Sequence, residues 1–74
     1  MHIVIGPPEA AWQERARVLA RTASPQEALR VLHPDMVLGQ SDLPVEGVTG
    51  VVLDGTRPEW AAFYREKGIP VEEL

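Results

Sequence analysis

The sequence predicts a single α/β domain over residues 1–74, built as a small three-layer sheet of three or four mostly parallel strands with three helices. Two observations predict this class. Short apolar runs rich in β-branched residues alternate with segments whose apolar residues recur at helical spacing. The runs are also apolar on both faces, as in parallel strands covered by helices on each side. The expected order is β-α-α-β-β-α-β.

The first half of the chain predicts one strand and two helices. Residues 2–5 form a strand that the Gly-Pro-Pro step at 6–8 ends. Residues 9–22 form a helix with one apolar face: Trp12, Ala16, Leu19, Ala20 and Ala23. Ser24-Pro25-Gln26-Glu27 has the pattern of a capping box and predicts a second helix that Pro34 ends.

The second half predicts two or three strands and one helix. Residues 36–38 and 48–53 are expected strands, joined by the loop 40–47, and an antiparallel pairing of these two is the alternative to a parallel sheet. Thr56-Arg57-Pro58-Glu59 repeats the capping pattern and starts a helix, which Gly68 ends. Residues 71–74 are expected as a weak edge strand.

Length and composition exclude several functions. The chain has 74 residues, no cysteine and a net charge of −4. Thiol catalysis and thiolate metal sites are therefore excluded, and a net acidic chain argues against nucleic-acid binding. No apolar run is long enough to span a membrane, and the N-terminal residues lack the pattern of a signal peptide, so we expect a cytoplasmic protein. Six arginines against one lysine indicate a GC-rich genome, with a thermophile or phage source as a hypothesis.

The first strand and its turn, Ile3-Val4-Ile5-Gly6-Pro7-Pro8, resemble the lead-in to a P-loop NTPase. That family continues with a Gly-Lys-Ser/Thr step that holds phosphates, whereas this chain continues with Glu9-Ala10-Ala11-Trp12. The two prolines remove N–H donors, and Glu9 adds negative charge at the start of the next helix. The turn therefore predicts a helix start that repels phosphate.

The expected function is a non-enzymatic protein-interaction or regulatory module, with no catalytic residues, no cofactor and no metal. Residues 1–34 carry a net charge of +1 and residues 35–74 a net charge of −5. The basic half suits an acidic protein partner, and uncovered apolar surface suggests a homodimer. The expected partner-binding residues are a basic stripe on the first helix and two aromatic residues of the last one: Arg15, Arg17, Arg21, Trp60 and Tyr64.

The alternative is a small-ligand or nucleotide-binding domain. Ligands of open parallel sheets bind beyond the carboxyl ends of the strands. The polar residues predicted at that edge are Gln40, Ser41, Asp42, Asp54, Thr56 and Arg57. Asp42 and Asp54 would suit a hard cation such as Mg²⁺ if they lie together, although turn chemistry accounts for Asp54-Gly55 equally well.

Overall fold

The computed structural model describes all of residues 1–74 and contains one parallel sheet with two α-helices. The strand order is β2-β1-β3-β4, and every neighbouring pair is parallel. The strands are β1 (His2–Ile5), β2 (Leu29–Leu32), β3 (Gly50–Leu53) and β4 (Val71–Glu73). The helices are α1 (Ala10–Ala23) and α2 (Pro58–Glu66), with two short 3-10 helices, η1 (Pro34–Met36) and η2 (Gln40–Asp42). The α/β class and the parallel sheet are confirmed, and the antiparallel alternative is excluded.

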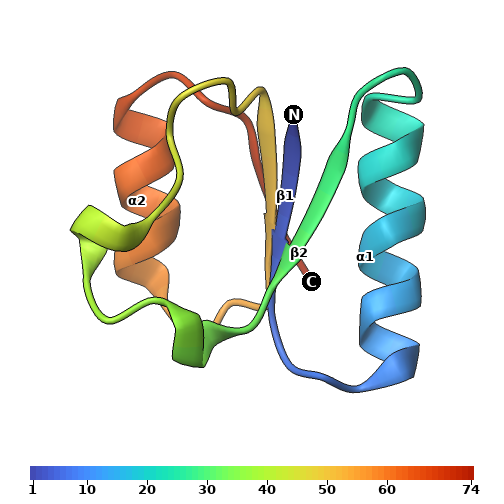
Figure 1. The fold of residues 1–74 in the computed structure, drawn as a ribbon, viewed down its shortest axis with the longest axis horizontal. Coiled ribbons are helices and arrows are strands. Elements are labelled where there is room, and N and C mark those ends of the chain that lie inside the picture. The colour runs from blue at the N-terminus through green and yellow to red at the C-terminus, as the bar shows by residue number, and fades with distance from the viewer.

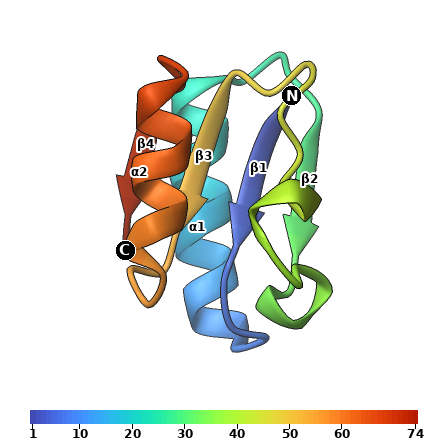
Figure 2. The same cartoon turned by 90° about the vertical axis from the view of Figure 1, so that its left-hand side faces the viewer.

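Three layers are present, but a loop replaces one of the expected helices. α1 covers one face of the sheet and α2 lies on the other (Figure 1). Figure 2 shows α2 in front of β3 and β4, and the segment that contains η1 and η2 in front of β1 and β2. This segment buries Val37, Leu43 and Val48 in the core beside α2. The prediction of three helices was wrong because residues 24–34 do not form one.

The second predicted helix is a turn followed by strand β2. Ser24 ends α1, its N–H donating to Ala20, and the Glu27 carboxylate bonds to Thr49 instead of capping a helix. Leu29 and Val31 then pack toward α1, while Leu32 packs into the core on the opposite face. A short apolar run fits a strand as well as a helix, and pairing with the buried β1 decides for the strand.

The strand predicted at residues 36–38 is absent. Pro34 starts η1 instead of ending a helix, and the His33 side chain accepts a hydrogen bond from the Asp35 N–H at that start. Of this apolar run only Val37 is buried in the core, whereas Met36 is 66% exposed and Leu38 92% exposed. The run has strand-like composition but no free position next to β1, whose two sides are taken by β2 and β3.

The core consists of two clusters that the alternation of the strands separates. Ile3, Ile5, Val51 and Leu53 point toward α2 and its neighbouring loop. Val4 and Val52 point toward α1, where they meet its buried face, formed by Trp12, Ala16 and Ala20. The central strands β1 and β3 are therefore buried on both sides, as the sequence predicted.

The last helix and the last strand agree with their predictions. α2 begins at Pro58, one residue later than a Thr56 cap would place it, and Gly68 follows it with a φ of +75°. The Ile69 N–H returns to the Tyr64 carbonyl, and β4 then pairs with β3. Neither helix has the length and apolar character needed to cross a bilayer.

Candidate functional site

At the carboxyl ends of the strands, where a ligand was expected, a side chain fills the position at the centre of the sheet. α1 follows β1 and α2 follows β3 on opposite faces, so the place where ligands bind in doubly wound sheets lies at the carboxyl ends of β1 and β3. Trp12 fills that place from one side, since its indole lies directly on Gly6. The indole N–H is buried and has no hydrogen-bond partner. The structure has no pocket at this edge.

The polar residues after β3 bond to one another or to α2. Asp54 Oδ1 accepts hydrogen bonds from the Thr56 N–H at 3.0 Å and the Thr56 hydroxyl at 2.7 Å. The Arg57 guanidinium lies 5.3 Å from the centre of the Trp60 ring, over its face. This is the geometry of a turn that leads into a helix.

The other three residues of the predicted ligand set do not follow a strand. Gln40, Ser41 and Asp42 form η2 and are exposed. Asp42 Oδ2 accepts a hydrogen bond from the Leu38 N–H at 3.0 Å. No group of three or more potential metal ligands exists in the chain. The ligand set therefore divides into two separate turns, because the strand that was to carry its first half is absent.

The predicted arginine stripe is divided between two flanks of α1. Successive helical residues are about 100° apart, so Arg15 and Arg17 lie about 160° apart, while Arg17 and Arg21 lie about 40° apart. Arg15 lines a groove that reaches Leu74, next to β4. Arg17 consequently lies on the opposite flank, on the side of β2, whereas Arg21 is about 140° from Ala16 at the centre of the buried face and points mostly away from the sheet.

The two aromatic residues predicted to face a partner are buried. Trp60 is 6% exposed and Tyr64 is 0% exposed, and both belong to the core below α2. The Tyr64 hydroxyl donates a 2.7 Å hydrogen bond to the Pro44 carbonyl, and burial raises the pKa of Tyr64 to about 12. These side chains hold α2 and the loop before β3 together, so their assignment to a binding surface is corrected.

The groove beside α1 has a volume of about 370 Å³. Its apolar floor comes from Val18, Leu19 and Leu74, and its polar rim from Glu14, Arg15 and Thr22. Val18 is 55% exposed and Leu74 43% exposed. The groove exists because α1 packs across β1, β2 and β3 and leaves the same face of β4 uncovered. Its rim carries both charges and does not select the sign of a partner.

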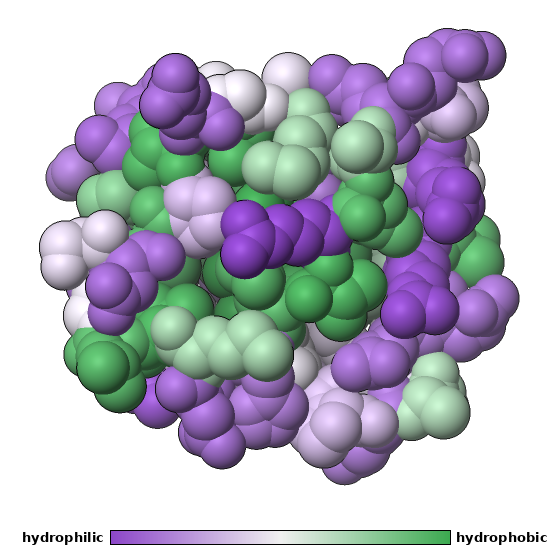
Figure 3. Space-filling model, viewed as in Figure 1, coloured by the Kyte–Doolittle hydropathy of each residue, from purple (hydrophilic) through white to green (hydrophobic).

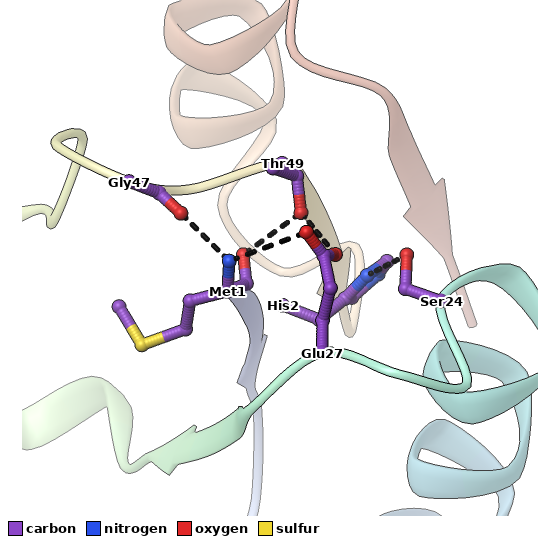
Figure 4. Close-up of polar contacts among 6 residues, drawn as sticks. All are labelled: Met1, His2, Ser24, Glu27, Gly47 and Thr49. Carbon is purple, nitrogen blue, oxygen red and sulfur yellow. Dashed lines mark hydrogen bonds and ion pairs between the residues drawn. The ribbon is translucent and has the colours of Figure 1, made fainter.

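A polar cluster joins the amino ends of the strands, and sequence reasoning missed it (Figure 4). The Met1 amino group donates to the Gly47 carbonyl at 2.7 Å and lies 3.7 Å from the Glu27 carboxylate, which also accepts a hydrogen bond from the Thr49 hydroxyl. This hydrogen bond from Thr49 is the main cause that lowers the pKa of Glu27. The cluster ties together segments far apart in the sequence, and nothing in the local pattern indicates it.

His2 is the buried member of this end of the sheet. Its ring packs on Gly50, and its Nδ1 lies 3.3 Å from the Ser24 hydroxyl. Burial lowers the pKa of His2 below its ordinary value, against the opposite effect of the nearby Glu27 carboxylate. The ring is 6% exposed, so it serves packing and offers no accessible base.

The feature most suited to binding is the outer edge of β2, which we call the β2 edge. The Ala28 and Leu32 carbonyls accept hydrogen bonds from β1, so the alternation of a strand turns the N–H and C=O groups of Leu29 and Val31 outward. β2 is an outermost strand, and no loop bonds to these four groups. The Leu29 and Val31 side chains are half-buried, and the Arg30 side chain is exposed.

Apolar side chains are exposed around the β2 edge. Figure 3 shows apolar surface gathered over the middle of the face on which β2 lies, crossed by a strongly hydrophilic side chain. Met36 and Leu38, which follow β2, are exposed apolar residues. The sequence did contain a signal for this strand, because apolar Leu29 and Val31 alternate with polar Arg30, but the capping pattern before it favoured a helix.

Comparison with protein-family models, curated proteins and solved structures gives no match for this chain.

Proposed function

We propose that this protein is a non-enzymatic interaction module whose β2 edge binds an acidic, extended segment of a protein partner. The observation that carries the proposal is the unpaired backbone of Leu29 and Val31 beside exposed Arg30. A segment that adds to the sheet here would gain hydrogen bonds to two N–H and two C=O groups, which is the usual route of β-strand addition.

Side chains on both faces of the β2 edge suit such a segment. On the α1 face, Leu29 and Val31 are half-buried against the core cluster below α1, so an added strand would place apolar side chains beside them. On the other face, Arg30 extends into solvent next to the buried Leu32. Alternating apolar and acidic residues match these two faces in register.

The charge around the edge selects the sign of the partner. Arg30 lies on β2 and faces the α2 side, and Arg17 lies on the flank of α1 toward the same edge of the sheet. Asp35 is the first acid after the strand and lies in η1, beyond its end. Arg30 on the open strand, with Arg17 toward the same edge, favours an acidic partner, through encounter rate and choice of partner more than through affinity.

The polar groups that a small ligand would need are already engaged within the fold, which favours the interaction module over a ligand-binding domain. Asp54 and Thr56 bond to each other, Arg57 covers Trp60, and Trp12 closes the space above Gly6. The polar residues after β3 therefore serve the fold, whereas the backbone groups at β2 have no partner.

Synthetic peptides test the proposal. A fluorescent hexapeptide of alternating valine and glutamate should bind the protein, and the same peptide with lysine in place of glutamate should bind at least about ten-fold more weakly. Arg30→Glu should reverse this preference. Arg15→Glu, the same charge change on the far flank of α1, should leave it in place.

A backbone variant separates strand addition from general charge attraction. Val31→Pro removes an outward N–H without cutting a bond to β1, so both peptides should lose affinity. Acidic binding that Val31→Pro and Arg30→Glu leave unchanged would overturn the proposal, and so would the absence of any binding by the acidic peptide.

A further inference from the structure

The opposite edge of the sheet has the features that the β2 edge requires of its partner. β4 is the other outermost strand, and its Val71 and Glu73 backbone groups point outward because Pro70 and Leu74 bond to β3. Glu72 and Glu73 are exposed and Val71 is half-buried. One edge of the molecule is therefore basic and the other is acidic, and both are unpaired.

We infer that the acidic strand that binds the β2 edge is β4 of a second copy of this chain, so that copies join head to tail into one continuous sheet. This inference rests on the proposed function, since it names the partner of the same edge. Charge complementarity between Arg30 on one edge and Glu73 on the other supports it.

The register of parallel pairing brings the complementary residues together. In this sheet, each residue whose backbone groups face the neighbouring strand pairs with one whose groups face away, as Val4 does with Val31. Outward-facing Glu73 of one copy can therefore lie opposite Arg30 of the next, on the face that carries α2. On the α1 face the same register places Leu74 opposite Val31, an apolar pair, and Glu72 opposite Leu29.

The two-fold alternatives place like charges together. Pairing β2 with β2 brings Arg30 of both copies onto the same face of the sheet, within one or two residues of each other. Pairing β4 with β4 does the same for Glu73. Like charges on neighbouring strands are destabilising, so charge favours the head-to-tail arrangement over the homodimer that the composition suggested.

A head-to-tail contact leaves one open edge of each kind at the ends of the assembly. Neighbouring strands rotate by about 20–25°, so four strands turn each copy by roughly 80–100° relative to the previous one. Growth then continues by addition of further copies unless the rotation closes a ring. The expected behaviour is a concentration-dependent series of oligomers, without a stop at the dimer.

Reciprocal charge reversal tests the inference by sedimentation velocity. Arg30→Glu alone opposes Glu73, and Glu73→Arg alone opposes Arg30, so each variant should associate at least about ten-fold more weakly than the unaltered chain. An equimolar mixture restores opposite charges at every contact and should recover the series. Circular dichroism melting curves identify any variant that fails to fold, and Val31→Pro supplies a second, charge-independent block of the same edge.

Each outcome of the sedimentation experiment either supports or overturns the head-to-tail sheet. Recovery in the mixture supports the head-to-tail sheet. An unaltered chain that stays monomeric at millimolar concentration, an assembly that neither charge reversal weakens, or a mixture that stays dissociated would overturn it. If the valine–glutamate peptide binds the β2 edge while the chain stays monomeric, the second copy is excluded and the proposed function is retained.

Discussion

The indole of Trp12 lies so close to Gly6 that a Cβ atom at residue 6 would be 2.2 Å from the ring. The contact joins the first half of α1 to the end of β1, and it fills the space in which a doubly wound sheet of this order would hold a ligand. Packing against Trp12 therefore requires glycine at residue 6. At the expected ligand edge, the residues around Gly6 stabilise the fold.

Gly6→Ala should destabilise the protein by about 2–3 kcal/mol, because the added methyl group overlaps a buried ring that has little room to move. Chemical denaturation measures the change. Gly39→Ala is the matched control, since a Cβ there meets nothing within 4 Å and its φ of −167° is ordinary extended backbone. An equal effect at both positions would contradict the packing role of Trp12.

Tyr64 should titrate at about pH 12 in the folded protein, which absorbance of the phenolate measures directly because the chain has one tyrosine. Burial raises the folded pKa above the unfolded value of 10.0, so the stability from this group is complete below about pH 10 and is lost as pH rises toward 12. Tyr64→Phe should remove this alkaline loss and cost about 1 kcal/mol near neutral pH through the lost bond to Pro44. Titration near pH 10 in the folded state would contradict the burial.

His2 should make the protein less stable in mild acid. Burial holds its folded pKa below the unfolded value of 6.5, so as pH falls below about 6.5 the unfolded state takes up the proton first. Stability should be level above that pH and fall below it until the folded His2 is protonated. Urea unfolding from about pH 8 to pH 5 measures the decline, and His2→Gln should make it shallower. A decline that is the same in the variant would exclude His2 as its source.

Thr49→Val should raise the pKa of Glu27 toward its ordinary value of 4.5, because the lost hydroxyl is the main donor to that carboxylate. NMR titration of the Glu27 carboxyl carbon measures the shift. Thr22→Val, which removes a hydroxyl that donates only to the Val18 carbonyl, is the control and should leave Glu27 unchanged. The stability due to Glu27 is present above the unfolded pKa and is lost as pH falls through the lower folded pKa. A Glu27 pKa insensitive to Thr49 would contradict the hydrogen bond as the cause.

Sequence patterns predicted the elements whose signals are local and consistent. The helix at residues 10–23 shows its buried face directly in the spacing of Trp12, Ala16 and Ala20. The strands at 2–5 and 50–53 are buried on both sides, as their continuous apolar runs indicated. The end of the last helix followed from Gly68, whose positive φ suits glycine.

The errors arose where long-range contacts outweigh local preference. Glu27 occupies the third position of a capping box, yet its carboxylate is satisfied by Thr49, which lies 22 residues away. The segment after Glu27 becomes β2 because β1 pairs with a strand on each side. The residues of that short segment alone do not show this requirement. The mistaken helix also hid the β2 edge, since an open strand edge exists only once the strand is recognised.

Amide hydrogen exchange along β2, followed by NMR, tests the open edge most directly. In the dilute, unbound protein the Arg30 and Leu32 amides should be protected by their bonds to β1, while the Leu29 and Val31 amides should exchange rapidly. Adding the valine–glutamate peptide, or raising the protein concentration, should protect Leu29 and Val31 by at least about ten-fold. Leu29 and Val31 amides that stay unprotected under both conditions, or that are already protected in the dilute protein, would contradict binding at the β2 edge.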